Sequence, residues 1–149
     1  MGYYMRFIST DEESVTLSQL DSALKQSSPD YSIERDESED VEGLILHGQE
    51  EYAQIELNVP GDGLFEEEVE ELIDFVNDAS GPRKAEVSDV LKRARTIVAV
   101  QVLFHERSTE ETLSKLDPLW TWLLENRKGL MQAGGEGYYD RSGLVMEVK

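Results

Sequence analysis

The chain has 149 residues, of which 39% are hydrophobic, and carries a formal net charge of −18 at pH 7. This length and apolar content predict one folded domain over residues 1–149 with its own core. The absence of cysteine excludes disulfides, thiolate metal sites and thiol nucleophiles. No stretch reaches the roughly 18 apolar residues of a membrane span and the N-terminus lacks a signal-peptide pattern, so we expect a cytoplasmic protein.

The charge is distributed unevenly along the chain. Residues 36–82 contain no Lys or Arg but are rich in Asp and Glu, whereas basic residues gather between 83 and 95. A field of this sign repels phosphate backbones and anionic membranes, and it attracts a basic protein surface or hard cations. We therefore expect no direct binding to nucleic acid or membranes. A surface that serves only solubility is the simpler interpretation.

The first quarter of the chain predicts a strand, a helix and a second strand. Residues 3–9 are β-rich, and Thr10 and Glu13 have the spacing of a capping box, which places the start of a helix there. A short strand is expected over residues 31–35. The helix between them carries an apolar stripe at helical spacing: Leu17, Leu20 and Leu24.

A hairpin is predicted next, with arms at residues 43–47 and 52–59. Apolar residues in the second arm alternate with Gln54, Glu56 and Asn58, so one face should be buried and the other wet or turned towards a ligand. If the polar face lines a groove, Glu56 should be partly desolvated and its pKa raised. It could then pair with a cationic or hydrogen-bond-donating ligand.

The second half begins with two predicted helices and a buried strand. Residues 65–78 form an amphipathic pattern whose polar face is almost wholly acidic, and residues 87–94 mark a shorter helix. The very apolar residues 97–104 predict a central strand. Ser108 has the form of a helix cap, while Pro118 either interrupts the following helix or begins a new one. A closing hairpin is expected after residue 129.

Two sequence motifs occur twice in the same order. Residues 16–21 (TLSQLD) and 112–117 (TLSKLD) differ only at the fourth position, and residues 43–45 (GLI) and 129–131 (GLM) follow them. This order indicates a duplicated strand–helix–strand–strand unit. The predicted segments are a first repeat at about 3–59, bridging helices at about 64–95 and a second repeat at about 97–148.

The predicted fold class is therefore α+β, with duplicated units forming a mainly antiparallel sheet on which helices pack. This order resembles the gyrase-inhibitor-like family of bacterial effector-binding domains. The resemblance covers most of the chain and is one of topology. It implies that two units pack about a pseudo-dyad, with a groove between them for a small molecule or protein partner. A ferredoxin-like α+β sheet with added elements fits the pattern nearly as well.

The repeat also suggests a ligand site. Tyr52 and Tyr138 occupy equivalent positions, each two residues after an acid, Glu50 or Glu136. Tyrosine offers apolar area and a polar tip, which suits binding. We predict a small-ligand site made of Tyr52, Glu56, Glu136 and Tyr138. Core tyrosines and a surface glutamate are the simpler alternative.

We predict a second candidate surface on the acidic helix, which would bind a basic protein partner through four acids: Glu66, Glu67, Glu70 and Glu71. No catalytic, metal-binding or cofactor motif is found. The two histidines, His47 and His105, each follow a predicted strand and have no metal-ligand spacing.

Three functions remain open at this point. The first is a non-enzymatic binding module with a groove between repeats. The second is an immunity protein or nucleic-acid mimic that inhibits a basic toxin or enzyme through its acidic face. The third is a hydrolase built on carboxylates, which three converging acids would favour.

Overall fold

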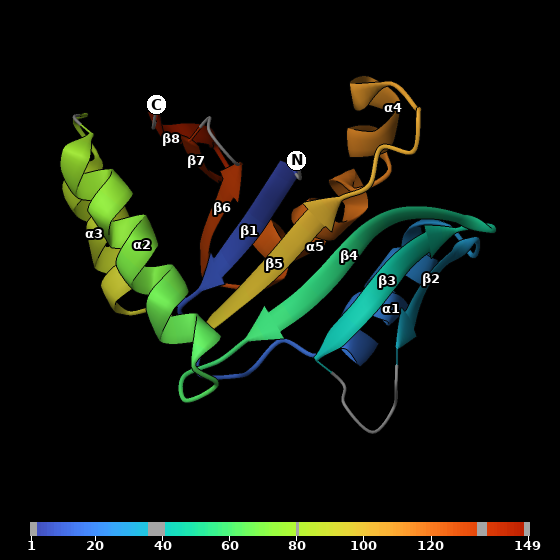
Figure 1. Ribbon diagram of the computed structural model, residues 1–149, viewed down its shortest axis with the longest axis horizontal. Coiled ribbons are helices and arrows are strands. Elements are labelled where there is room, and N and C mark those ends of the chain that lie inside the picture. Colours follow the sequence, from blue (N-terminus) through green and yellow to red (C-terminus); the bar gives the residue numbers. More distant parts are fainter. Residues whose placement is uncertain (1–2, 36–40, 80, 134–136, 148–149) are drawn as a thin grey trace.

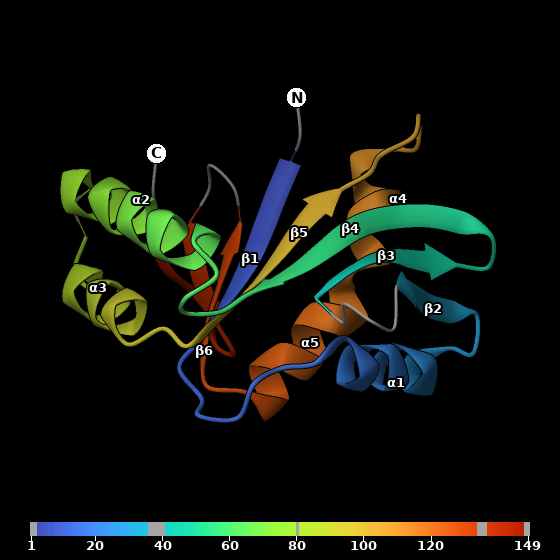
Figure 2. The same ribbon diagram turned by 60° about the horizontal axis from the view of Figure 1, so that its bottom comes forward.

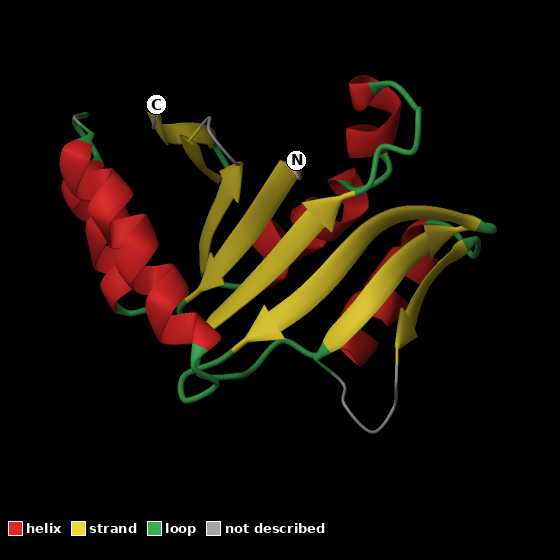
Figure 3. Ribbon diagram, in the orientation of Figure 1, coloured by secondary structure: helices red, strands yellow, loops and turns green. Residues whose placement is uncertain are grey.

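The computed structural model describes residues 3–35, 41–79, 81–133 and 137–147. Within them the chain forms five helices and eight strands, and every strand belongs to one antiparallel sheet (Figure 3). The α+β class is confirmed. In the described part of the chain, no helix is long and apolar enough to cross a membrane.

The elements follow one another in the order expected for the first half of the chain: β1 (Tyr3–Ser9), α1 (Leu17–Ser27), β2 (Tyr31–Arg35), β3 (Glu42–His47), β4 (Glu50–Asn58), α2 (Leu64–Asp78) and α3 (Lys84–Lys92). The second half contains β5 (Thr96–Val102), α4 (Thr109–Ser114), α5 (Asp117–Asn126), β6 (Gly129–Ala133), β7 (Gly137–Asp140) and β8 (Gly143–Glu147). A new helix thus begins at Asp117, with Pro118 in its first turn where proline is tolerated.

The strand order is β2-β3-β4-β5-β1-β6-β7-β8, with β5 and β1 in the centre (Figure 1). In chain order, β2, β3 and β4 are placed from one edge of the sheet to its centre, whereas β6, β7 and β8 are placed from the centre to the other edge. A two-fold axis that exchanged β1 with β5 would require the strand numbers to increase outward from the centre on both sides. The structure therefore does not confirm the duplicated units.

The repeated TLS motif also lies in two different settings. Residues 16–21 form the N-cap and first turn of α1, and Leu17 is fully buried. Residues 112–117 instead span the end of α4 and the start of α5, and Leu113 is only half-buried. A helix start and a helix end are not equivalent positions.

Helix α1 begins six residues beyond the expected Thr10. Its N-cap is Thr16, whose hydroxyl accepts a hydrogen bond from Gln19 N at 3.1 Å, while Thr16 N donates to Gln19 Oε1 at 3.2 Å. This reciprocal pair is the capping box of α1. Thr10 instead donates its N–H to Lys128 O at 2.9 Å, which extends the pairing of β1 with β6. The predicted stripe on α1 is confirmed as buried.

Helices cover the two faces of the sheet unequally. Helices α1 and α5 lie on what we call the lower face, and α2 and α3 lie on the upper face (Figure 2). Strand alternation divides the core accordingly, because successive residues point to opposite faces. In β1, Phe7 belongs to the lower cluster with Leu20 and Leu123, and Ile8 belongs to the upper cluster with Leu72.

The upper face is covered only in part. Helix α3 contacts β1, β6 and β8, and α2 packs on α3 and on the upper cluster through Phe65, Leu72 and Val76. Strands β3, β4 and β5 have no helix in front of them (Figure 1). We call this region the open half of the upper face, and it is defined by Leu44, Gln54, Glu56, Ala99 and Gln101.

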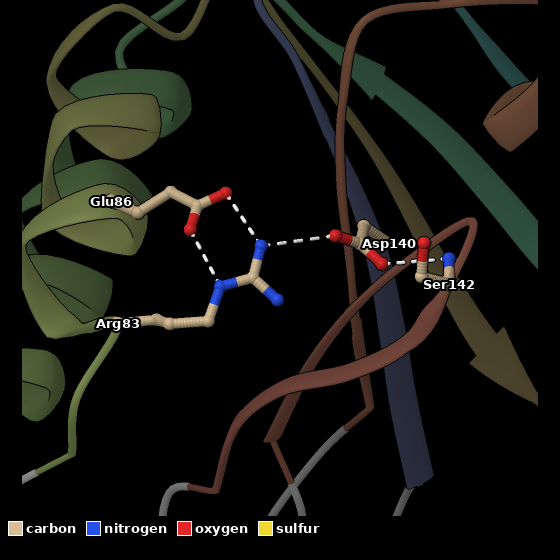
Figure 4. Close-up of polar contacts among 4 residues, drawn as sticks. All are labelled: Arg83, Glu86, Asp140 and Ser142. Carbon is tan, nitrogen blue, oxygen red and sulfur yellow. Dashed lines mark hydrogen bonds and ion pairs between the residues drawn. The ribbon is translucent and has the colours of Figure 1, made fainter.

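An ion-pair network fastens the upper helices to the far edge of the sheet (Figure 4). Arg83 binds both carboxylate oxygens of Glu86 at 2.7 and 2.8 Å and donates to Asp140 Oδ2 at 3.2 Å. Asp140 also accepts a hydrogen bond from Ser142 N at 2.8 Å. The network joins the start of α3 to the turn between β7 and β8, so the helices stay over that half of the sheet.

Candidate functional site

Cross-strand pairing places a line of polar residues across the upper face. Glu42 lies opposite Glu56, and Glu56 lies opposite Ala99. Ala99 then pairs with Arg6, which pairs with Gln132. Residues from four distant parts of the chain therefore share one row, and only the strand register brings them together.

A second row runs beside it across the open half, and the two rows form the floor of a groove. Glu34, Leu44, Gln54, Gln101 and Tyr4 are successive partners in this second row. The groove has a volume of about 540 Å³. The groove is lined by those members of the two rows that belong to β1, β2, β3, β4 and β5, with the exception of Arg6. Arg35, at the edge of the sheet, also lines it.

Glu56 is the half-buried acid of this groove. Burial raises the pKa of Glu56, and the negative charges of Glu42, Glu68 and Asp62 raise it further. Its carboxylate has no hydrogen-bond partner among the described residues. Like charges that surround a partly desolvated carboxylate make it a good counter-ion for a cation from outside.

The nearest cation on the same row is already engaged. Arg6 Nε lies 3.5 Å from Glu68 Oε1 of α2, and Arg6 Nη1 donates to Gln132 Oε1 at 3.1 Å. Burial raises the pKa of Glu68, which Arg6 opposes through its charge. This pair ties α2 to the sheet, so Arg6 does not neutralise Glu56.

Tyr52 does not flank Glu56, and that expectation is wrong. A β-bulge between β3 and β4 pairs Ile45 with Ala53 but Leu46 with Glu51, so Tyr52 is the extra residue. Tyr52 therefore joins the lower cluster beside Ala53 and is 2% exposed. Its hydroxyl donates to Glu50 Oε2 at 3.0 Å.

Tyr138 lies on the expected face but far from Glu56. It pairs with Gln132 and is 2% exposed within the upper cluster, and burial raises its pKa to about 12. Four strand spacings separate it from Glu56, about 19 Å in all. Glu136 lies outside the described residues. The predicted quartet is therefore not assembled.

The four acids predicted for partner binding are all exposed on α2: Glu66, Glu67, Glu70 and Glu71. Glu66 also accepts a hydrogen bond from Gly61 N at 3.1 Å, which closes the turn before the helix. Glu71 shares one helical stripe with Glu68, which contacts the sheet, and with two exposed apolar residues, Leu64 and Phe75.

Both histidines lie near the start of β4, because His47 pairs with Glu50 and His105 contacts Glu51. Glu56 and Asp62 lie towards the other end of that strand. His47 packs edge-on against Tyr31, with ring centroids 4.7 Å apart. His105 Nε2 lies 3.3 Å from Glu51 Oε1. Among the described residues there is no group of three or more Asp, Glu, His or Cys side chains that could hold a metal ion.

Several residues of the groove were not predicted from the sequence, above all Tyr4, Glu42 and Gln101. Alternation in 3–9 and 97–104 was a usable signal for which residues share a face. It could not indicate that β4 lies between β3 and β5. Comparison with family models, with curated proteins and with solved structures found no match for this chain. The resemblance to gyrase-inhibitor-like domains stays a prediction.

Proposed function

We propose that this protein is a non-enzymatic binding module whose open half holds a basic segment of a partner protein. The observation that carries the proposal is Glu56, a half-buried carboxylate in a groove of about 540 Å³, with three further acids acting on it. A Lys or Arg side chain from outside would offset the desolvation of Glu56 and the repulsion from its neighbours.

The surroundings of the groove suit a polypeptide with both cationic and apolar side chains. Tyr4 is 43% exposed at one side of the groove and offers apolar ring area, while Arg6 Cζ already lies over its ring, 5.9 Å from the centroid. Gln54 and Gln101 have side-chain amides without hydrogen-bond partners among the described residues, so they can bind a backbone. These groups provide anchors for a segment that lies across the strands.

A second candidate is an inhibitor or immunity protein that presses α2 against a basic toxin or enzyme. The observation that favours it is the exposure of Phe75 at 56% and Leu64 at 53% on the same stripe as Glu71. Apolar residues among acids are typical of a protein interface. The two candidates differ in whether the groove floor or the helix supplies the binding energy.

The test uses a fluorescein-labelled lysine-rich peptide and a glutamate-rich peptide of equal length, with binding followed by anisotropy. We expect saturable binding of the lysine-rich peptide that weakens with salt. Glu42→Gln with Glu56→Gln should weaken it about tenfold. The matched control, Glu110→Gln with Glu125→Gln, removes the same charge from exposed positions on α4 and α5.

An equal loss in both double variants would mean that only net charge matters, which contradicts the proposal. If peptide binding weakens in a variant with Glu71→Gln and Phe75→Gln but not in the variant with Glu42→Gln and Glu56→Gln, the result would favour the inhibitor that binds through α2. Binding of the glutamate-rich peptide with similar affinity would overturn both.

A further inference from the structure

A second cavity lies on the other side of the molecule, at the lower face. It is open to solvent and lies between α4 and α5 on one side and β1, β6 and β7 on the other, with a volume of about 490 Å³. This is within the range of small-molecule sites. It shares no lining residue with the groove of the open half.

The cavity wall is aromatic and apolar. Trp120 of α5 is 5% exposed, and Tyr3 and Tyr139 are half-buried at the same cavity. Met5 and Met131 add two thioether side chains. Aromatic faces attract cations as well as apolar groups, and thioethers adapt their shape to a guest.

The charged groups that line the cavity are all acidic. No Lys, Arg or His contributes to its lining, whereas Asp117 and Asp140 do. Asp140 is already occupied, since it binds Arg83 and Ser142 N (Figure 4). Asp117 has no hydrogen-bond or ion-pair partner among the described residues. Asp117 is exposed to solvent, and the partial desolvation of its carboxyl on the side of the protein raises its pKa.

Trp120 also carries a polar group without a partner. Its indole Nε1 is buried and has no hydrogen-bond partner among the described residues. A buried donor without an acceptor is uncommon and costly in a folded protein.

We infer that this cavity binds a small organic cation with an apolar or aromatic body, whose charge lies against Asp117 and whose body lies against Trp120. The occupant is an amine or quaternary ammonium compound, because an anion would meet two carboxylates, whereas a cation gains from the negative charge of Asp117 and a neutral molecule does not. The inference is independent of the basic segment proposed for the open half.

Fluorescence of Trp120 provides the readout. The chain has two tryptophans, so Trp122→Phe leaves Trp120 as the only indole. In that background the protein is titrated with benzyltrimethylammonium, benzyl alcohol and phenylacetate, which share a ring and differ in charge. We expect a saturable change with the cation, at least about tenfold weaker binding of the alcohol and no binding of phenylacetate.

Two variants identify the site. Asp117→Asn should weaken binding of the cation about tenfold, whereas Glu125→Gln, on the same helix but outside this cavity, should leave it unchanged. Thr121 is exposed at the cavity, so Thr121→Phe should block entry without disturbing the core. Thermal unfolding in the absence of probe confirms that each variant is folded.

Three results would overturn the inference: no saturable change with the cation up to 20 mM probe, equal affinity for benzyl alcohol, or an affinity that Asp117→Asn leaves unaltered. Binding of the lysine-rich peptide at the open half should not respond to Asp117→Asn. The two proposals can therefore fail separately.

Discussion

The two faces of the sheet are built from the same strands and differ in what lies over them. The lower face is packed against α1, α4 and α5, and its cluster contains most of the large, fully buried side chains, including Phe7, Ile55 and Leu119. The upper face has a smaller cluster under α2 and α3, and its other half is open. Burial on the lower face supplies stability, while the open half leaves polar side chains available for binding.

Two carboxylates show the same contrast at the level of single groups. Asp21, beside the lower face, accepts hydrogen bonds from Ile33 N at 2.9 Å and from Lys25 Nζ at 2.8 Å. Burial alone would raise its pKa, but these hydrogen bonds and the nearby Lys25 and Arg35 charges lower it overall. The pKa of Glu56, in contrast, is raised by burial and by other acids. Ionised Asp21 therefore stabilises the fold, whereas the ionisation of Glu56 opposes folding.

The largest effect is expected in the lower cluster. Leu20 is fully buried between α1 and the sheet, so Leu20→Ala should lower the free energy of unfolding by about 2–5 kcal/mol. Urea denaturation measures the change. Gln54→Ala, an exposed change in the open half, should stay within about 0.5 kcal/mol. Equal losses in the two variants would mean that the faces do not differ in their contribution to stability.

The next largest effect is expected for Asp21, whose carboxylate accepts a hydrogen bond from Ile33 N of the edge strand β2. Asp21→Asn should cost about 1–2 kcal/mol at neutral pH, because a charge-assisted hydrogen bond is lost. The pKa of Asp21 is lowered from 3.8, so its contribution is present above that pH and disappears as pH falls through the folded-state pKa. Urea denaturation at several pH values checks this. A difference that persists unchanged in strong acid would contradict the assignment.

Glu56→Gln should have a smaller effect of the opposite sign. The pKa of Glu56 is raised above 4.5, so its ionisation opposes folding as pH rises through the interval between 4.5 and the folded-state pKa. Above that interval the variant should be more stable by about 0.5 kcal/mol, a small value because the site is solvent-screened. Below pH 4.5 the two proteins should converge. A destabilised variant at neutral pH would show that Glu56 has a structural partner.

The smallest effect is expected for Phe75, which is 56% exposed on α2. Phe75→Gln removes an apolar surface side chain and introduces a better helix former, so the free energy of unfolding should change by less than about 0.5 kcal/mol. Thermal and urea unfolding measure it. A clear loss of stability would show that Phe75 packs in the core despite its exposure.

Local sequence patterns were sufficient to predict the elements themselves. The apolar stripe on α1 and the amphipathic pattern of α2 are set within each helix, because buried positions recur every three or four residues. The alternation in β4 likewise predicted that Ile55 and Leu57 are buried. The start of α1 was misplaced because two capping sequences compete there, and only Thr16 lies directly before the helix.

Tertiary structure decided which residues meet. The bulge in β4 arises from its pairing with β3, and it moved Tyr52 to the lower face although its spacing from Glu56 indicates the upper face. The strand order separated Tyr138 from Glu56 and placed Glu42 beside it. Local periodicity fixes the faces of one strand, whereas register, bulges and neighbours depend on contacts between distant segments. The groove exists because of those contacts.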